Sequence, residues 1–331
     1  MRWKILKLLK NKSPGYLSGE EAARILSVSR TSVWKNINIL QEEGYRIKSS
    51  TRLGYRLLEI PDLLYPAEIF QYLDNSLIAA SPSQILHHLQ VSSTNTLLKE
   101  LAEDGAAEGT VIVAEEQKTG RGRLGRSWAS PFGKGLWFSV LLKPALPPQE
   151  TQTLTLLSAT ATAKGIAKTV PSLRPGIKWP NDLLLNGRKC CGILTELKAE
   201  VDQLHYIIMG IGINVNTSRE DFPRELRESA TSLSIESGGK IPRALLCSAV
   251  LQELDNSYRE LLLHGTEPVI KEWKRWNITL GKKVALETRG GIFKGTAVDL
   301  ESNGGLVVEG DSGGKKRFLA GEVSLVPGRD S

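Results

Sequence analysis

Cysteine is scarce in this chain of 331 residues, and its three occurrences are poorly placed for disulfides. Cys190 and Cys191 are neighbours, and Cys247 lies far from both. Adjacent cysteines poorly suit a mutual disulfide, and an odd count leaves one thiol over, which excludes a small secreted domain held by disulfides. We expect reduced thiols with packing roles and a cytoplasmic protein.

Long apolar runs are also absent. No stretch approaches the roughly 18 apolar residues that a membrane span requires. The chain starts with Met1-Arg2-Trp3-Lys4 and enters an amphipathic segment without the apolar core of a signal peptide. The sequence therefore predicts no membrane partner.

Histidine is the third scarce residue type. The histidines show no metal-ligand spacing, and neither an H-E-x-x-H motif nor a G-x-x-x-x-G-K-[ST] loop occurs. We expect no metal held by protein side chains and no histidine acid–base chemistry. The four histidines are His87, His88, His205 and His264.

Basic residues, by contrast, are concentrated at the N-terminus. Residues 1–58 carry 12 Lys+Arg and 4 Asp+Glu, whereas the rest of the chain carries 31 and 32. With 40% hydrophobic and 24% charged residues the composition is globular, and the length suggests about two or three domains. These patterns predict a small anion-binding module joined to a near-neutral body.

The first 60 residues have the pattern of a winged helix-turn-helix domain. Ser18 and Glu21 form a capping box that predicts one helix start, and Ser29 caps a further helix a short turn later. Two short helices with this connection are typical of a helix-turn-helix, here over about residues 19–38. A basic hairpin over residues 45–57 supplies the wing.

The second of these helices carries side chains suited to DNA. Those that lie off its apolar stripe are able to reach phosphates and base edges in a major groove. We expect DNA binding at residues 1–60; the alternative is a protein-interaction module with a solvated basic face. We expect Trp34 to pack in the core or between helices rather than to contact a base. The candidate DNA contacts are Arg30, Thr31, Ser32, Lys35 and Asn36.

A domain boundary follows, where prolines bracket an apolar patch at residues 59–66. We expect a linker over 61–82 that includes a connecting helix at 67–75. From about residue 85, strands alternate with helices, which predicts a mixed α/β domain of about 200 residues over 83–279. Its expected strands are 110–114, 135–143, 176–178, 183–185, 193–196 and 204–210, and its expected helices are 153–170, 243–263 and 267–276.

A glycine- and arginine-rich loop lies between the first two of these strands, at residues 117–128. Its glycines satisfy the G-x-G-x-x-G pattern of dinucleotide-binding turns. However, the third glycine opens no helix, and no acidic residue follows at the required distance. The remaining readings are a plain exposed basic loop and, as we prefer, a mobile loop that becomes ordered around an anion.

The side chains of this loop suit a nucleotide. Arg121, Arg123 and Arg126 form a dense cationic patch whose charges repel one another unless anions are near. Trp128 offers a flat face for a purine ring. The loop therefore predicts an anionic, nucleotide-like ligand.

A second motif, Lys-Trp-Pro-Asn-Asp at residues 178–182, places Lys178 at a strand end beside amide and carboxylate groups. That arrangement suits charge stabilisation on a carboxylate or phosphate, although an ordinary surface lysine is the alternative. The glycines and asparagines of residues 210–216 give a weaker signal of the same kind. With no candidate nucleophile, a site rich in Lys and Arg favours a reaction between anions.

Taken together, these motifs resemble the bifunctional biotin–protein ligase and biotin operon repressor family over nearly the whole chain. Lipoate ligases share the catalytic fold but lack the paired loop and lysine motifs and the winged helix. The resemblance is carried by residues 93–95 (Ser-Thr-Asn), 117–128, 178–182, 192–196 (Gly-Ile-Leu-Thr-Glu), 210–214 and 321–325 (Gly-Glu-Val-Ser-Leu).

The resemblance implies a multidomain α+β fold. Its parts would be the winged helix-turn-helix at 1–60, a central mixed α/β catalytic domain of the biotin/lipoate ligase type at 83–279, and a small C-terminal SH3-like β-barrel at 280–331. Short strands at 284–288, 292–298 and 306–309 with glycine-rich turns agree with the last of these. Val326 stands where some members carry arginine.

It also implies the chemistry. Biotin and ATP with Mg²⁺ would give biotinoyl-5′-adenylate, and a lysine of the biotin carboxyl carrier protein of acetyl-CoA carboxylase would then attack the adenylate; other biotin-dependent carboxylases are further candidate partners. Lys178 and Arg123 would be catalytic. Biotin would contact Ser93, Thr94, Asn95, Gln117, Arg121, Gly122, Arg123, Lys178 and Gly192. The adenylate would contact Arg121, Arg123, Arg126, Trp128, Lys178, Asn181 and Asn214.

The resemblance finally implies a regulatory role. The adenylate would order the loops and allow a homodimer that presents two winged helices to a palindromic biotin operator. Docking of the carrier protein would compete for the same surface. Two alternatives stay open: a ligand-sensing transcription factor without ligase turnover, and a ligase whose N-terminal domain does not bind DNA.

Overall fold

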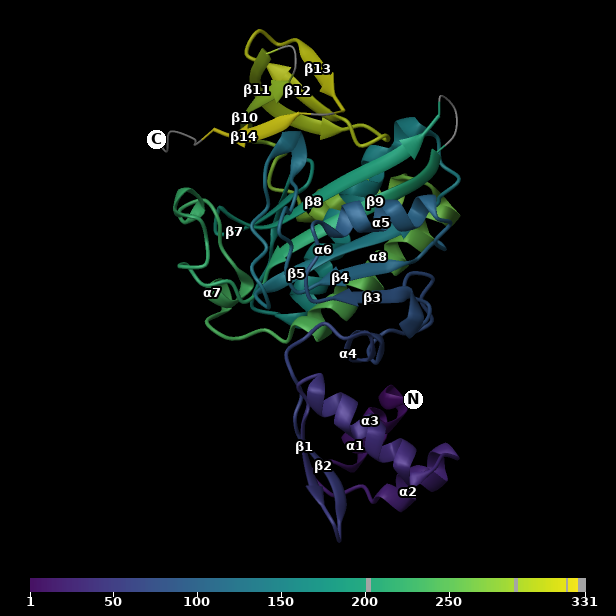
Figure 1. The fold of residues 1–331 in the computed structure, drawn as a ribbon. Helices are drawn as coiled ribbons and strands as arrows, with labels where there is room; N and C mark the ends of the chain where they lie inside the picture. Colours follow the sequence, from purple (N-terminus) through teal and green to yellow (C-terminus); the bar gives the residue numbers. More distant parts are fainter. Residues whose placement is uncertain (201–203, 289–290, 320, 327–331) are drawn as a thin grey trace. The chain divides into compact units, whose positions relative to one another are not determined.

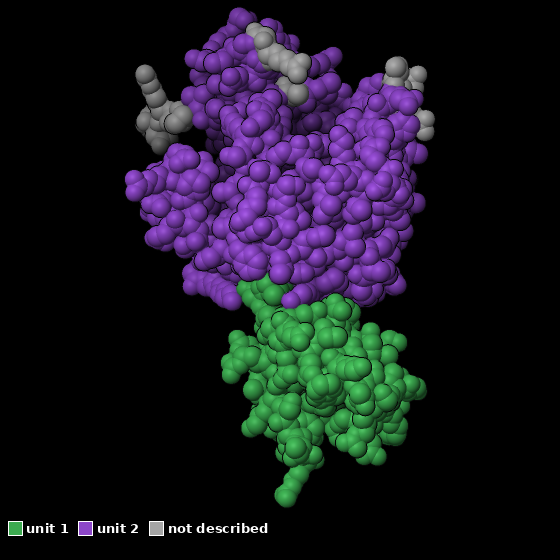
Figure 2. Space-filling model, viewed as in Figure 1, with its two compact units in different colours: residues 1–63 green, residues 64–331 purple. Residues whose placement is uncertain are grey.

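The computed structural model describes residues 1–200, 204–288, 291–319 and 321–326 (Figure 1). The chain divides into two compact units, residues 1–63 and residues 64–331 (Figure 2). Within the described ranges, no helix combines the length and the apolar character that crossing a membrane requires. Each unit is described by itself below.

The first unit is a winged helix-turn-helix, as the sequence predicts. The Ser18 hydroxyl accepts a hydrogen bond from the Glu21 N–H at 3.0 Å, and the Ser29 hydroxyl accepts one from the Ser32 N–H at 3.1 Å. These caps fix where the second and third helices begin. The elements are α1 (Arg2–Lys12), α2 (Gly19–Leu26), α3 (Arg30–Glu42) and the antiparallel hairpin of β1 (Arg46–Ser50) and β2 (Gly54–Glu59).

One prediction for this unit is wrong. Trp34 does not pack in the core, because 52% of its surface is exposed. The buried stripe of α3 consists of Val33, Ile37 and Leu40, which are spaced to face the other two helices. Trp34 follows Val33 by one residue and is therefore turned about 100° away from that stripe.

The segment predicted as a linker also differs. Residues 64–82 belong to the second unit, and Leu64, Ile69 and Ile78 are fully buried in its core. Buried carboxylates accept the backbone N–H groups of this irregular segment: Asp255 accepts those of Leu77 (2.6 Å) and Ile78 (2.8 Å). Its helix α4 (Pro66–Phe70) is shorter than predicted.

The second unit is built on a seven-stranded sheet within the described residues, with order β3-β4-β5-β9-β8-β7-β6. β3 and β4 are parallel, and the other neighbours are antiparallel. The strands are β3 (Ile85–His88), β4 (Val111–Ala114), β5 (Gly135–Leu142), β6 (Gly176–Lys178), β7 (Asp182–Leu185), β8 (Arg188–Ala199) and β9 (Leu204–Asn214).

Helices cover both faces of this sheet. Successive strand residues point to opposite faces, so Ile112 of β4 packs with Leu98 of α5, whereas Val111 and Val113 belong to the larger core that contains α6 and α8. Figure 1 shows α5 on one side of the sheet and α6 and α8 on the other. The helices are α5 (Thr94–Glu103), α6 (Thr151–Thr169), α7 (Leu233–Ser237), α8 (Arg243–His264) and α9 (Glu267–Trp276).

The C-terminal part is a five-stranded antiparallel sheet, with order β13-β12-β11-β10-β14. Alternate side chains such as Val284, Leu286 and Val323 are buried, which gives this small sheet its own apolar face. The predicted strand-rich character of this C-terminal part is confirmed; residues 327–331 of the predicted SH3-like barrel lie outside the described ranges. The strands are β10 (Lys283–Thr288), β11 (Gly291–Leu300), β12 (Leu306–Gly310), β13 (Lys315–Phe318) and β14 (Glu322–Leu325).

Candidate active site

A cavity of about 300 Å³ in the second unit brings the predicted site residues together. Its walls come from the glycine- and arginine-rich loop (residues 117–128), the start of α5, strands β5, β8 and β9, the 178–182 turn and β14. All thirteen residues predicted to contact biotin or the adenylate line it. They are Ser93, Thr94, Asn95, Gln117, Arg121, Gly122, Arg123, Arg126, Trp128, Lys178, Asn181, Gly192 and Asn214.

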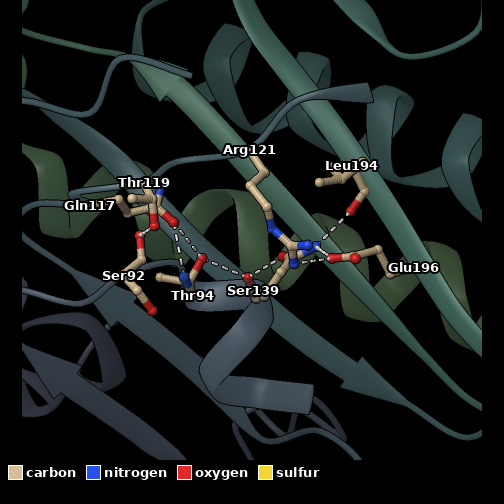
Figure 3. A network of polar contacts seen from close by, with 9 residues as sticks. Ser92, Thr94, Gln117, Thr119, Arg121, Ser139, Leu194 and Glu196 are labelled. Carbon is tan, nitrogen blue, oxygen red and sulfur yellow. Dashed lines mark hydrogen bonds and ion pairs between the residues drawn. The ribbon is translucent and has the colours of Figure 1, made fainter. Parts of the chain in front are cut away.

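One wall of the cavity is a polar network (Figure 3). The Thr94 backbone N–H and hydroxyl both donate to the Gln117 Oε1 atom, at 2.9 and 3.1 Å. The Ser139 hydroxyl lies 2.7 Å from the Thr94 hydroxyl and 2.6 Å from the Asn95 Oδ1 atom, two acceptors that share its single hydrogen. These buried groups hold one another in fixed orientations, so the wall presents a set pattern of donors and acceptors to a ligand.

Ser139 was missed by the sequence analysis. It is fully buried on β5 and faces Gly210 of β9 across the sheet. The available signal was a single serine inside the apolar run of residues 135–142. A lone hydroxyl in such a run indicates a polar partner on one face of the sheet.

The network continues to the arginine loop through Glu196. The Glu196 Oε2 atom accepts a hydrogen bond from the Asn95 Nδ2 group at 2.7 Å and from the Arg121 guanidinium at 3.0 Å. Figure 3 shows Arg121 and Glu196 pointing toward each other. Glu196 lies within the Gly-Ile-Leu-Thr-Glu motif but was not predicted as a site residue.

The floor of the cavity is made of glycines. Gly192 of β8 and Gly212 of β9 are register partners, and the Trp128 ring lies against both. A Cβ atom on Gly212 would stand 2.6 Å from the Trp128 Nε1 atom, and one on Gly192 would stand 2.9 Å from its Cζ3 atom. A Cβ on Gly210 would overlap the Asn95 side chain. Glycine is therefore required here by close approach rather than by backbone conformation.

The loop arginines are held by oxygen atoms of the protein. Arg123 donates to the Asn181 Oδ1 atom at 2.8 Å and to the Gly321 carbonyl at 3.2 Å, and Arg126 forms an ion pair with Glu322 at 2.5 Å. Burial lowers the pKa of the Arg123 guanidinium, opposed by the charges of Asp182 and Glu322. Arginine remains charged at neutral pH even so.

The structure shows which side chains neutralise the loop arginines, and the sequence alone did not reveal them. Glu196 and Glu322 are far from the loop in the chain, yet each pairs with one of its arginines. Part of the negative charge that the cationic patch requires therefore comes from the protein itself.

Two lysines that line the cavity pair with one carboxylate. Lys178, the last residue of β6, lies 3.4 Å from Asp182, and Lys189 of β8 lies 2.6 Å from the same side chain. The Lys189 ammonium also stands 5.3 Å from the centre of the Trp128 ring. Lys189 was missed, and nothing in its sequence surroundings distinguishes it from an ordinary strand lysine.

The two predicted asparagines are tied to the backbone. The Asn181 Nδ2 group donates to the Ile193 carbonyl at 2.8 Å, and the Asn214 Nδ2 group donates to the Thr231 carbonyl at 3.0 Å. Since the Asn181 Oδ1 atom accepts from Arg123, both ends of its amide are engaged. Asn181 therefore positions Arg123 in this structure.

A buried charge pair supports the base of the loop. Glu115 and Arg243 are fully buried and lie 2.8 Å apart, and Glu115 also accepts the Leu64 backbone N–H at 2.6 Å and pairs with His87 at 3.1 Å. Burial acts to raise the pKa of Glu115, but the His87 hydrogen bond and the Arg243 charge outweigh it and hold this pKa below its usual value. Glu115 stands two residues before Gln117, where the loop begins.

Neither thiol nor metal chemistry is indicated at the site. All three cysteines are free and buried, and burial raises the pKa of Cys190 and Cys247 to about 12. Such thiols are not nucleophiles at neutral pH. Among the residues that the structure describes, no group of three or more His, Cys, Asp or Glu side chains is arranged to hold a metal ion.

In the first unit, α3 presents the predicted DNA contacts. Arg30, Thr31 and Lys35 are exposed, and Ser32 is half-buried. The Asn36 side chain donates to the Ser32 carbonyl at 2.8 Å, one turn back along the helix. The exposed face thus carries two cations and a hydroxyl.

Three families match successive parts of the chain. Residues 2–56 match an HTH domain, residues 88–214 match the biotin/lipoate A/B protein ligase family, and residues 279–326 match the biotin protein ligase C terminal domain. The three matches correspond to the helix-turn-helix unit, the seven-stranded sheet with its cavity, and the C-terminal sheet.

Similar proteins extend over the same length. A bifunctional ligase/repressor BirA of Bacillus spizizenii is 39% identical over 97% of this chain and 97% of its own. A protein of the same name in Escherichia coli is 30% identical over 97% of this chain and 96% of its own. A solved structure, the biotin protein ligase of Aquifex aeolicus in complex with biotin and ATP, is 31% identical with a TM-score of 0.63 and covers 73% of this chain and 98% of that one.

Proposed function

The chain belongs to the biotin protein ligase family, in its bifunctional ligase/repressor form, and we propose that it activates biotin with ATP, transfers it to a carrier-protein lysine and represses biotin genes. One observation carries this proposal. A polar wall suited to a neutral ring system and a cationic wall suited to a carboxylate and phosphates face the same 300 Å³ cavity. Biotinoyl-5′-adenylate has both kinds of group.

The biotin ring occupies the polar side. Thr94, Asn95 and Gln117 are fixed by their mutual contacts and by Ser139, so they present oriented groups to the ureido ring. A ligand that matches this fixed pattern of donors and acceptors binds better than an analogue that lacks the matching groups. This wall therefore accounts for selection of biotin.

The first half-reaction takes place on the cationic side. A biotin carboxylate oxygen attacks the α-phosphorus of ATP, and the bond to the bridging oxygen breaks to release pyrophosphate. Attack joins two anions, so donors aimed at the developing charge contribute most, typically about 3–4 kcal/mol each. Arg121, Arg123 and Lys178 line the cavity and serve this role. Lys189, held to Lys178 through Asp182, adds a fourth cation.

Adenine stacks on Trp128. The indole packs against Gly192 and Gly212 and contacts Trp137 edge-on, with ring centres 6.5 Å apart. In the second half-reaction, the neutral amine of a carrier-protein lysine attacks the acyl carbon and AMP leaves with its phosphate. Closure of the loop keeps water away from the reactive anhydride until then.

Mg²⁺ enters with ATP. The described residues form no metal-binding group of their own, and Mg²⁺ commonly binds through substrate phosphates, water and one or two carboxylates. Among the described residues, the two carboxylates that line the cavity, Asp182 and Glu322, are each paired with cationic side chains; the ATP phosphates and water would therefore hold most of the coordination of Mg²⁺. Its chemical contribution would be charge neutralisation on the phosphates.

Repression uses the first unit. A homodimer of adenylate-bound chains presents two α3 helices to the two halves of a palindromic operator. The three free thiols agree with a cytoplasmic location, where reduced cysteines persist.

A transfer assay tests the proposal. The chain is incubated with biotin, MgATP and a biotin carrier domain, and the carrier mass is measured. We expect one biotin to be added on a lysine, no addition without ATP, and addition that is slower by about 100-fold or more with the Lys178→Ala variant. Ligand binding without transfer would instead support a sensor that lacks ligase turnover. If the chain with biotin and MgATP does not bind a biotin-gene promoter, the repressor part of the proposal fails and the ligase part remains.

A further inference from the structure

Helix α3 carries a large aromatic side chain on its solvent-facing side. Trp34 is 52% exposed, and Arg30, Thr31 and Lys35 are exposed around it. Residues four apart lie on the same side of a helix. Arg30 and Asn38 therefore flank Trp34 one turn before and one turn after it.

Packing within the unit does not account for this position. The core side of α3 is filled by Val33, Ile37 and Leu40, each buried, and Trp34 is not among the buried residues. Its indole is exposed on the same helix face as Arg30 and Lys35, so a ligand that binds these cations would also meet the indole. The charge around it selects the partner, since residues 1–58 carry 12 basic and 4 acidic side chains. A polyanion such as DNA matches that charge.

We propose that Trp34 is a sequence-reading residue of the DNA-binding unit, and that its indole packs against thymine C5-methyl groups in the major groove. The inference rests on the proposed repressor function and adds the side chain that distinguishes bases. Arg30 and Lys35 can bind phosphates of any sequence and the acceptor atoms of guanine, but neither can detect a thymine methyl group. Apolar contact with the thymine methyl is a form of direct base readout that cations do not supply.

The test uses the full chain and a DNA duplex that the wild-type protein selects from a randomised pool with biotin and MgATP. Affinity is measured for this duplex, for the same duplex with deoxyuridine in place of thymidine, and for a random duplex. Deoxyuridine removes only the methyl group. We expect each contacted methyl to contribute about fourfold (about 0.8 kcal/mol) to wild-type affinity.

The same three affinities are measured for the variant Trp34→Ala, so that the effects of the side chain and of the thymine methyl can be compared. We expect this variant to bind the selected duplex about tenfold more weakly, to bind the random duplex as the wild type does, and to lose the deoxyuridine effect. Trp34→Phe should keep part of that effect. Lys35→Ala is the matched control: it should weaken binding to both duplexes and lower the salt dependence by about one counterion.

Several results would overturn the inference. The first is a deoxyuridine effect of equal size in wild type and Trp34→Ala. The second is a loss of affinity by Trp34→Ala that is as large on the random duplex as on the selected duplex. The third is that Trp34→Ala loses self-association but keeps its sequence selectivity. Thermal melting and transfer of biotin to the carrier check that the variant is folded. If the wild type selects no sequence at all, the repressor function itself fails. That result is distinct from a failure confined to Trp34.

Discussion

The carboxylate of Glu196 accepts a hydrogen bond from the guanidinium of Arg121 at 3.0 Å, although 75 residues separate them in the chain. The same oxygen accepts the Asn95 side chain, which belongs to the polar wall of the cavity. A ligand carboxylate or phosphate that binds Arg121 must therefore compete with Glu196. The Arg121–Glu196 ion pair is partly open to solvent, and its strength determines how much affinity the ligand loses to this competition.

Glu196→Gln should strengthen the binding of an anionic ligand. Glutamine keeps an acceptor for Asn95 but removes the charge that competes for Arg121. Because the pair is 45% and 32% exposed, the gain should be at most about fivefold. Calorimetric titration with biotin measures it, with Glu200→Gln as a charge-matched control outside the cavity. Weaker binding by Glu196→Gln would show that Glu196 supports the ligand site.

Lys178→Ala should reduce adenylate formation by about 100-fold or more, because in the proposed reaction it removes a donor directed at the phosphate. Pyrophosphate release measures this step apart from transfer to the carrier. Lys271→Ala, on the exposed side of α9, is the matched control and should be normal. Near-normal release by Lys178→Ala would refute the assigned role.

Gly212→Ala should displace Trp128 and raise the KM for ATP at least about tenfold. The new Cβ would stand 2.6 Å from the indole nitrogen, and the strand backbone beneath it is fixed by pairing with β5 and β8. Gly239→Ala is the control, because a Cβ there meets no atom within 4 Å. An unchanged KM for ATP would mean that adenine does not stack on Trp128 at this position.

Glu115→Gln should destabilise the second unit by about 3–5 kcal/mol, since it leaves Arg243 buried without its counter-charge. The pKa of Glu115 is lowered in the folded state, so its contribution is present above the pKa of the unfolded chain. It is lost as pH falls through the lower, folded pKa. Denaturant unfolding at a series of pH values measures both effects.

The wild type should therefore lose more stability in acid than Glu115→Gln does, while other carboxyl groups with lowered pKa values, such as Glu236 and Glu253, act equally in both. Glu225→Gln, at an exposed position, controls for loss of a carboxylate alone. Identical pH profiles for wild type and Glu115→Gln would show that the pair does not contribute as argued.

Much of this fold was predictable because the signals are local. Ser18 and Ser29 cap the helices that they were predicted to cap, and the hairpin after Gly44 follows directly. The strands and long helices of the second unit also lie close to their predicted positions. Caps, turns and hydrophobic spacing act over a few residues, so a single sequence carries them.

Other features depend on distant pairing. Ser139 enters the site only because β5 lies beside β9, and Lys189 only because β8 passes beneath Trp128. The error at Trp34 has a similar origin. Trp34 was expected to pack in the core or between helices, whereas its position on the helix turns it outward.

The sequence by itself determined the three-part organisation, the concentration of positive charge in the first unit, and the loop and lysine motifs from which the chemistry was inferred. Only the tertiary structure decided which carboxylates pair with those cations and which glycines pack against Trp128. The reason is physical: an arginine specifies a need for negative charge, but Glu196 and Glu322 meet it only after the strands that carry them are paired.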